Sequence, residues 1–300
     1  NPGELISHAY SALYAAKREH AGCLMYDGDD TTLANRMGMR GELRRAVAQN
    51  ELVLNYQPKV HFSLESVPCV EALVRWQHPE RGFIPPDQFI PLAEETGLIR
   101  PLGDWVLNEA LRQVRTWMDA GTPIGVAVNL SMHNLQDPNL VETVKSLLEH
   151  WQVPPNLLKL EVTESSLASH PDRVLEVLQQ LRDIGMELSI DDFGTGYSSL
   201  MQLKRLPVAE LKIDKSFVQG MLQNDNDHVI VRTTIDLGHN LGLNVVAEGV
   251  EDQAMWDTLQ GLGCDSAQGY HMARPMGAKQ LEQWMIDSPW AQPMLARIPA

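Results

Sequence analysis

Residues 158–192 read LKLEVTESSLASHPDRVLEVLQQLRDIGMELSIDD, and this stretch holds the pattern that decides the fold. The apolar run Leu158–Val162 predicts a buried strand, Asp172–Ile184 has the spacing of an amphipathic helix, and Glu187–Ile190 predicts a second strand. Because a strand, a helix and a strand in succession form a right-handed crossover, we expect the two strands to lie parallel in one sheet.

The same alternation continues along the chain from about residue 42. Further strands are predicted at Leu52–Tyr56, Cys69–Val74, Ile124–Leu130, Glu210–Ile213, Asn244–Ala247 and Ala267–Tyr270. Further helices are predicted at Trp105–Ala120, Asn139–His150, Val229–Leu241 and Asp252–Leu262. Eight strands without a glycine-rich dinucleotide-binding motif favour a closed (β/α)8 barrel over a doubly wound sheet.

One connection departs from this pattern. The link between Leu52–Val60 and Cys69–Val74 is too short for a crossover helix and predicts a hairpin, so one barrel strand is expected to be antiparallel. The predicted fold is therefore an α/β protein with a modified (β/α)8 TIM barrel over residues 31–290. Residues 1–30 are expected to be a separate segment with a linker, and residues 291–300 a tail.

The composition of the 300 residues excludes some classes of partner. There are 24 Lys and Arg residues against 39 Asp and Glu, a formal net charge of −15, which argues against binding a DNA or RNA polymer. No apolar run approaches the ~18 residues of a membrane span, so we expect no membrane contact by this fragment. The spacing of Cys23, Cys69 and Cys264 contains no CxxC motif, which predicts reduced thiols and a cytoplasmic location for this fragment. The expectation covers the fragment alone, since a longer parent protein could carry a membrane anchor.

Acidic and amide residues follow the predicted strands at their carboxyl ends, where barrel enzymes build their sites. They are Glu71, Asn129, Glu161, Glu164, Asp191, Asp192, Asp214, Glu248 and Gln268, with Lys212 among them. A single strand-end acid is more often a helix cap or a solvated residue. Acids gathered at one rim repel one another unless a cation neutralises them, and hard divalent cations prefer oxygen ligands. Two such ions bridged by Asp191-Asp192 would suit attack of water on a phosphodiester.

Three features keep two interpretations each. Lys212 is either a structural counterion or a group that orients or deprotonates the attacking water. Arg75 either clamps a phosphate oxygen or forms a surface ion pair. The glycines that follow Asp191-Asp192 make either a tight turn or a mobile loop that controls the site.

These residues match a known family. Glu71-Ala72-Leu73-Val74-Arg75 resembles the signature of bacterial EAL-domain cyclic-di-GMP phosphodiesterases, and the resemblance covers roughly residues 40–285. The other matching motifs are Tyr56-Gln57-Pro58, residues 89–97, Asn129-Leu130-Ser131, Glu161-Val162-Thr163-Glu164, Asp191–Leu200, Leu211-Lys212-Ile213-Asp214, residues 247–251 and Gln268-Gly269-Tyr270.

The resemblance implies a modified barrel with one antiparallel strand. It implies hydrolysis of cyclic-di-GMP to linear pGpG with two Mg²⁺ or Mn²⁺ ions. The first ion's ligands would be Glu71, Asn129, Glu161 and Asp191, and the second ion's shell Asp191, Asp192 and Glu248. Catalytic roles would fall to Lys212, which activates the water, to Glu248, and to Glu164, which holds the Asp191–Leu200 loop.

The resemblance also implies partners. Gln57, Arg75, Asn134 and Gln268 would line the substrate site, and a homodimer would form through the region near the Asp191–Leu200 loop. Residues 1–28 are similar to the C-terminal tail of GGDEF domains, whose catalytic loop this sequence lacks. The alternative function is a non-catalytic cyclic-di-GMP receptor or interaction module. Because no expected metal ligand is substituted, the sequence favours the enzyme.

Overall fold

The computed structural model describes residues 31–49, 51–62, 69–168, 171–196 and 200–291. They fall into two compact units, one from the described parts of Asn1–Leu52 and Trp76–Leu98, the other from those of Val53–Arg75 and Ile99–Ala300. The expected remnant at residues 1–30 and residues 292–300 of the expected 291–300 tail lie outside the described residues, so the domain boundaries stay predictions.

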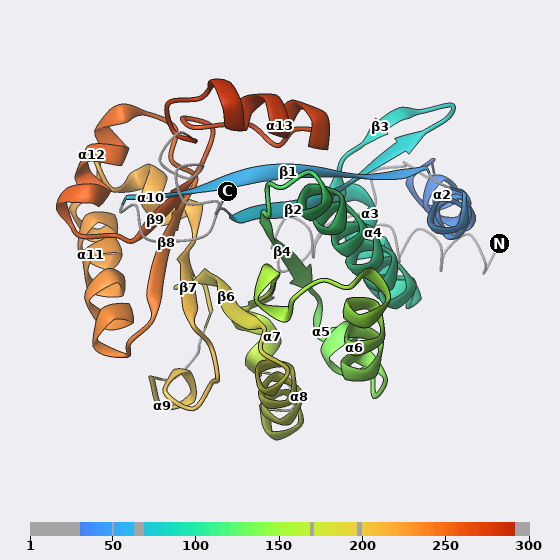
Figure 1. Cartoon of the computed structure of the whole chain (residues 1–300), viewed down its shortest axis with the longest axis horizontal. Coiled ribbons are helices and arrows are strands. Elements are labelled where there is room, and N and C mark those ends of the chain that lie inside the picture. The colour runs from blue at the N-terminus through green and yellow to red at the C-terminus, as the bar shows by residue number, and fades with distance from the viewer. Residues whose placement is uncertain (1–30, 50, 63–68, 169–170, 197–199, 292–300) are drawn as a thin grey trace. The chain divides into compact units, whose positions relative to one another are not determined.

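Eight strands form a closed ring, and all of their residues except Leu52 and Trp76–His78 belong to the second unit (Figure 1). These are β1 (Leu52–His61), β2 (Cys69–His78), β4 (Gly125–Leu130), β5 (Leu158–Thr163), β6 (Glu187–Phe193), β7 (Glu210–Ile213), β8 (Asn244–Glu248) and β9 (Ser266–Gln268). Their order is β1-β9-β8-β7-β6-β5-β4-β2, and a pairing of β1 with β2 closes the ring. The pairs from β2–β4 round to β8–β9 are parallel, whereas β1 pairs with β9 antiparallel. The predicted barrel with one antiparallel strand is confirmed.

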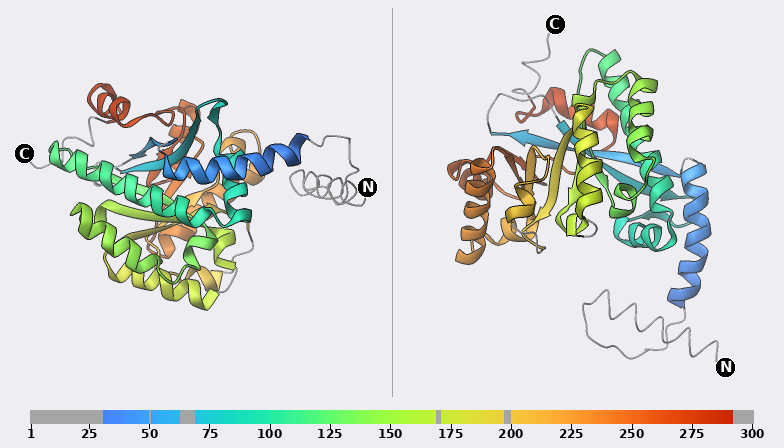
Figure 2. Two further views of the ribbon diagram at one scale, coloured as in Figure 1. Left: turned by 90° about the vertical axis from the view of Figure 1, so that its right-hand side faces the viewer. Right: turned by 90° about the horizontal axis from the view of Figure 1, so that it is seen from below.

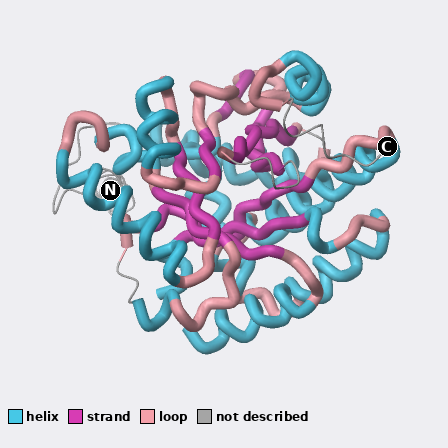
Figure 3. The backbone as a smooth tube through the Cα atoms, turned by 60° about the vertical axis from the view of Figure 1, so that its left-hand side comes forward, coloured by secondary structure: helices cyan, strands magenta, loops and turns pink. Residues whose placement is uncertain are grey.

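Helices cover the outside of the strands, as Figure 3 shows. They are α4 (Ile99–Asp119), α5 (Met132–Leu135), α6 (Leu140–Trp151), η1 (Pro155–Leu157), α7 (Glu164–Ala168), α8 (Pro171–Asp183), α9 (Leu200–Leu203), α10 (Lys215–Gly220), α11 (Asp225–Asn240), α12 (Gln253–Gly261) and α13 (Ala278–Asp287). Helix α4 packs on β4, α8 on β6, and α11 on β7 and β8. On α4 the buried residues Leu107, Leu111 and Val114 recur at helical spacing, which explains why this face turns to the sheet.

Alternation along the strands separates an apolar layer from a polar one. In β5, Leu158, Leu160 and Val162 are fully buried on the face that the helices cover. The residues between them, Lys159 and Glu161, point into the barrel, because successive side chains of a strand face opposite sides. The apolar core therefore lies between strands and helices, and charged groups occupy the barrel interior.

The first unit is smaller. It contains α2 (Thr31–Ala48), β3 (Gly82–Ile84) and α3 (Pro86–Thr96), with α2 packed against α3 (Figure 2). Strand β3, which the sequence pattern did not predict, pairs with the Trp76–His78 end of β2. Trp76 is fully buried and donates a 3.1 Å hydrogen bond to Glu51, so it is a core residue. No helix within the described ranges combines the length and the apolar character needed to cross a membrane.

Candidate active site

Lys212 on β7 lies at the centre of the strand-end cluster. Its fully buried Nζ is close to four carboxylates: Glu248 Oε1 at 2.6 Å, Glu161 Oε2 at 2.7 Å, Asp191 Oδ1 at 3.2 Å and Glu71 Oε2 at 3.7 Å. Burial by itself would lower the pKa of Lys212, but the carboxylates raise it well above its ordinary value. Four partners are more than a simple counterion needs.

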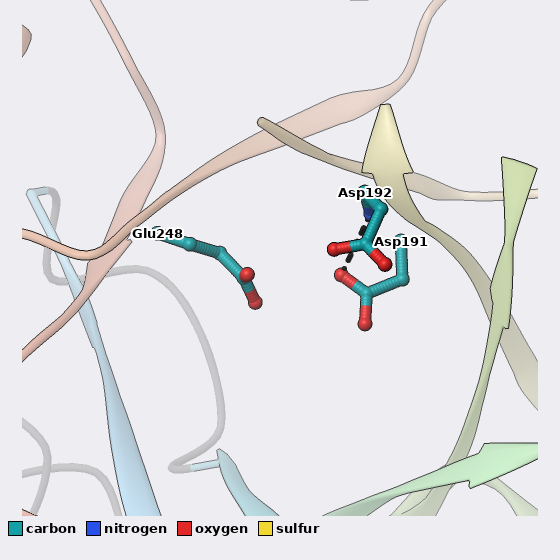
Figure 4. Close-up of side chains that lie close together, drawn as sticks. All are labelled: Asp191, Asp192 and Glu248. Atoms are coloured by element: carbon teal, nitrogen blue, oxygen red, sulfur yellow. Dashed lines mark hydrogen bonds between the residues drawn. The ribbon is translucent and has the colours of Figure 1, made fainter. Parts of the chain in front are cut away.

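Asp191, Asp192 and Glu248 face one another across the mouth of the barrel (Figure 4). One carboxylate oxygen of each lies within 4.8 Å of the others. Burial and the neighbouring Asp191 raise the pKa of Asp192 to about 6, and burial likewise raises the pKa of Glu248. The crowding of these acids is what a divalent cation would relieve.

An irregularity in β6 brings the two aspartates together. Consecutive residues of a regular strand point to opposite faces, so Asp191 and Asp192 would normally diverge. The register of β6 against β7 shifts between Ile190 and Phe193, and Asp192 has φ 54°, in the left-handed region. The Asp192 amide then donates a 3.0 Å hydrogen bond to Asp191 Oδ1. Non-glycine residues rarely adopt this conformation, and a strained residue of this kind is typical of functional sites.

A row of hydrogen-bonded amide and carboxylate side chains extends the cluster to further strands of the barrel. Asn129 Nδ2 donates to Glu71 Oε1 at 2.7 Å, and Gln268 Nε2 donates to Glu71 Oε2 at 2.6 Å. Gln268 also donates to Gln57 Oε1 at 3.1 Å, and Gln57 donates to the carbonyl oxygen of Ala273 at 3.0 Å. Strands β1, β2, β4 and β9 thus bring four of the predicted site residues into one network.

The oxygen-rich donor set fits a hard divalent cation. Beside the three acids at the mouth, Glu161 Oε1 is buried and accepts no hydrogen bond from the described residues. A buried carboxylate oxygen without a donor is costly, and carboxylate oxygens are the ligands that Mg²⁺ and Mn²⁺ prefer. The carboxylates of Glu71, Glu161, Asp191, Asp192 and Glu248 therefore suit a divalent cation by their chemistry.

Glu164 lies at the start of α7 and holds the segment after β6. Its Oε2 accepts the backbone N–H of Gly194 at 2.9 Å and of Gly196 at 3.1 Å. A Cβ on Gly196 would lie 2.9 Å from the Glu164 carboxyl carbon, so a larger residue here would displace this carboxylate. The predicted Asp191–Leu200 loop is described except for residues 197–199.

Three predicted residues have partners close to them in the sequence. Asn134 is buried and forms a capping box with Ser131 at the start of α5. Asp214 caps α10 by accepting the Ser216 amide at 3.0 Å, and it also contributes to the raised pKa of Asp192. Arg75 is half-buried, and its Nη1 donates to the carbonyl oxygen of Val74 at 2.9 Å. Neither Asn134 nor Arg75 is brought into the pocket described next, so their substrate roles stay predictions.

A cavity of about 300 Å³ opens over the cluster. It is lined by Gln57, Glu71, Leu73, Asp191, Lys215, Gln219, Glu248, Gly249, Glu251, Gln268, Gly269 and Tyr270. Tyr270 is 51% exposed, and the Arg274 guanidinium lies over its ring at 4.2 Å from the ring centre. Lys215, Gln219 and Glu251 were not predicted, because they follow the strands at no regular distance.

Lys59, Lys159 and Glu210 form a second buried charge cluster, which the sequence pattern did not predict. Lys159 and Glu210 each precede a predicted site residue, Glu161 or Lys212, by two positions, and so face the barrel interior with it. That spacing was the available signal. Glu210 is 2% exposed, and the two lysines hold its pKa well below the usual range against the effect of burial.

Comparison with known proteins agrees with this geometry. The EAL domain matches residues 40–275. The bifunctional diguanylate cyclase/cyclic di-GMP phosphodiesterase MucR of Pseudomonas aeruginosa is 44% identical over 281 residues, 93% of this chain and 41% of that protein. The cyclic di-GMP phosphodiesterase PdeR of Escherichia coli is 39% identical over 282 residues, 93% of this chain and 42% of that protein. The chain spans about two-fifths of the length of these relatives.

A solved structure supports the same relationship. The PaMucR phosphodiesterase in its c-di-GMP complex superposes with a TM-score of 0.77 and 48% sequence identity, covering 80% of this chain and 98% of that one. Residues 40–275, which the EAL domain matches, contain the barrel strands and every carboxylate around Lys212. The chain therefore belongs to the EAL domain family.

Proposed function

We propose that this chain hydrolyses one phosphodiester bond of cyclic-di-GMP and releases linear pGpG. The observation that carries the proposal is the buried Lys212 ammonium held by four carboxylates, three of which, Glu71, Asp191 and Glu248, line the pocket. The phosphodiesterase activity for which MucR and PdeR are named and the c-di-GMP bound in the PaMucR complex support the choice of substrate.

The proposed site uses two divalent cations, Mg²⁺ or Mn²⁺. Glu71, Asn129, Glu161 and Asp191 would hold one, and Asp191, Asp192 and Glu248 the other. When bound, such ions lower the pKa of water and neutralise phosphoryl charge. Lys212, oriented from two sides by Glu161 and Glu248, positions the attacking water and stabilises the developing negative charge.

Other side chains position the substrate and maintain the geometry of the metal-binding aspartates. Gln57 and Gln268 line the pocket and present amide groups to the nucleotide. Glu164 keeps the backbone after Asp192 in place, which maintains the direction of both aspartates. Arg75 and Asn134 are proposed as further substrate contacts made once the nucleotide binds.

The product assay tests the proposal. Chromatography after incubation with cyclic-di-GMP and Mg²⁺ or Mn²⁺ is expected to show pGpG, and Glu71→Ala and Lys212→Ala are expected to abolish it. Lys279→Ala, an exposed lysine on α13, is the matched control and should retain full turnover. Tight nucleotide binding without product at saturating metal would instead identify a receptor.

The assembly and the location are parts of the same proposal. We expect a homodimer through the region near the Asp191–Leu200 loop, in a cytoplasmic fragment. Sedimentation velocity with and without cyclic-di-GMP measures the oligomeric state. A monomer at all concentrations in both conditions would contradict the dimer and leave the hydrolytic proposal standing.

A further inference from the structure

Beneath the proposed site lies a buried chain of ion pairs that the hydrolytic mechanism does not use. Lys59 on β1 has no exposed side-chain surface, and its Nζ lies 2.6 Å from Glu210 Oε1. The other oxygen of Glu210 is 2.6 Å from Lys159 Nζ. Lys159 in turn reaches Glu187, whose side chain is 54% exposed, at 3.1 Å.

Strand register places this chain one layer below the strand-end acids. Glu210 and Lys159 come two residues before Lys212 and Glu161 on parallel strands. Lys59 comes two residues after Gln57, which is the same direction in space because β1 runs antiparallel. Side chains two apart in a strand share a face, so all three point into the barrel.

Glu161 connects the two layers. Its Oε2 accepts a 2.7 Å hydrogen bond from Lys212, while its Oε1 lies 3.5 Å from Lys59 Nζ. Both Glu161 and Lys59 are fully buried, so water does not screen the attraction between them. Rotation of the carboxylate is therefore opposed from both sides, by Lys212 above and Lys59 below.

We propose that Lys59 is a positioning residue that fixes the orientation of the Glu161 carboxylate, and through it the Lys212 ammonium. Glu210 also pairs with Lys59 through one oxygen, and its other oxygen pairs with Lys159, which makes no contact of its own with Glu161 among the ion pairs of the described residues. The role deepens the proposed hydrolysis and rests on it for its kinetic consequence. Lys59 is not among the residues that line the pocket, and of its two ion-pair partners Glu161 is the one that contacts Lys212, so we expect it to act through Glu161.

The charge balance of the buried lysines and glutamates also supports a role for Lys59 in holding Glu161. Within the lower layer two ammonium groups share the single carboxylate of Glu210, and only Lys159 has a further partner at the exposed Glu187. The ammonium left over is that of Lys59, and the nearest other carboxylate is Glu161. A buried ammonium without sufficient counter-charge is costly, which favours holding Glu161 at this distance.

Lys59→Met and Lys159→Met form a matched pair for the test. Each removes one of the two lysines on Glu210, and both variants are expected to lower Tm. Only Lys59→Met removes the contact with Glu161. We expect Lys59→Met to lower kcat about tenfold or more with KM within about threefold of wild type. Lys159→Met should keep kcat within about threefold.

A structural measurement removes the dependence on turnover. In crystals of Lys59→Met the Glu161 carboxylate is expected to rotate away from its present position, and in Lys159→Met to stay in it. Lys59→Gln, which keeps a donor toward Glu210 without the charge, serves if Lys59→Met does not fold, and the same rotation is expected. Equal kcat in the two methionine variants, or an unmoved Glu161 after loss of the lysine, would overturn the proposal. Absence of turnover in the wild type would contradict hydrolysis alone, because the rotation of Glu161 is still measured.

Discussion

Lys212 and Glu161 form an ion pair of 2.7 Å in which neither side chain has any exposed surface. Both residues lie on parallel strands of the barrel and face its interior. Removing one member of such a pair leaves a buried charge without its counter-charge, which destabilises a protein far more than loss of a surface pair. The consequence differs for each member of the cluster, and the following variants separate them.

Lys212→Met leaves four carboxylates facing one another without an ammonium. The free energy of unfolding of the metal-free protein is expected to fall by roughly 3–5 kcal/mol. Added Mn²⁺ should then raise Tm more in the variant than in the wild type, because the cation replaces the lost positive charge. Calorimetric scans with chelator and with Mn²⁺ measure the difference, and Lys279→Met is the control. An equal Mn²⁺ effect in both proteins would contradict a cation site at these acids.

Glu164→Gln keeps one oxygen acceptor but removes the charge that holds Gly194 and Gly196. Hydrogen bonds to a charged acceptor are about twice as strong as neutral ones, so we expect a loss of about 1–2 kcal/mol in stability. Amide hydrogen exchange at both glycines should accelerate, and kcat should fall because Asp192 loses its support. Glu176→Gln on the exposed face of α8 is the control. Unchanged exchange at the two glycines would rule out the holding role.

Asp192 allows charge to be separated from backbone strain. Asp192→Asn and Asp192→Ala both remove the carboxylate, so both are expected to reduce turnover strongly. Asparagine tolerates the left-handed conformation with φ 54° better than alanine, so only Asp192→Ala should also lose about 1 kcal/mol of stability. Steady-state kinetics and urea unfolding of both variants provide the comparison. Equal stability of the two would show that the strained backbone relaxes.

The stability lost on Glu210→Gln substitution is expected to depend on pH. Burial alone would raise the pKa of Glu210, but Lys59 and Lys159 hold it well below its ordinary value of 4.5. A lowered pKa means that the ionised group stabilises the fold above the unfolded-state pKa, and that this contribution declines as the pH falls through and below 4.5. The wild type should therefore exceed Glu210→Gln in unfolding free energy most at about pH 7 and less at about pH 4.

Urea unfolding of both proteins across this range measures the effect, with Glu176→Gln as the exposed control. The control is expected to follow the wild type at every pH. A difference between wild type and Glu210→Gln that stays constant down to the lowest pH would show that the two lysines do not perturb Glu210.

Much of the fold was predictable because its signals are local. Alternating apolar strands and amphipathic helices predicted the barrel, and the short link after β1 predicted the reversed strand. The strand-end positions of Glu71, Glu161, Asp191 and Lys212 followed from the same pattern, since parallel strands of a barrel present their carboxyl ends at one mouth. Strand β3 was missed because three residues carry no recognisable period.

Other features depend on contacts between distant segments. The register shift that turns Asp191 and Asp192 to the same side arises where β6 pairs with β7, and no residue pattern near Asp192 predicts it. Lys59 and Glu210 are 151 residues apart, so their pairing is decided by the reversed direction of β1 and the closure of the ring.

The sequence by itself determined the alternation of strands and helices, the closed barrel and the set of oxygen-bearing residues at its mouth, because these depend on residue type and short-range spacing. Only the tertiary structure decided which carboxylates surround Lys212, that Asn134 and Arg75 have other partners, and that Lys59 reaches Glu161 from below. Distances between side chains depend on strand register and closure, and these are set by the packing of the whole barrel.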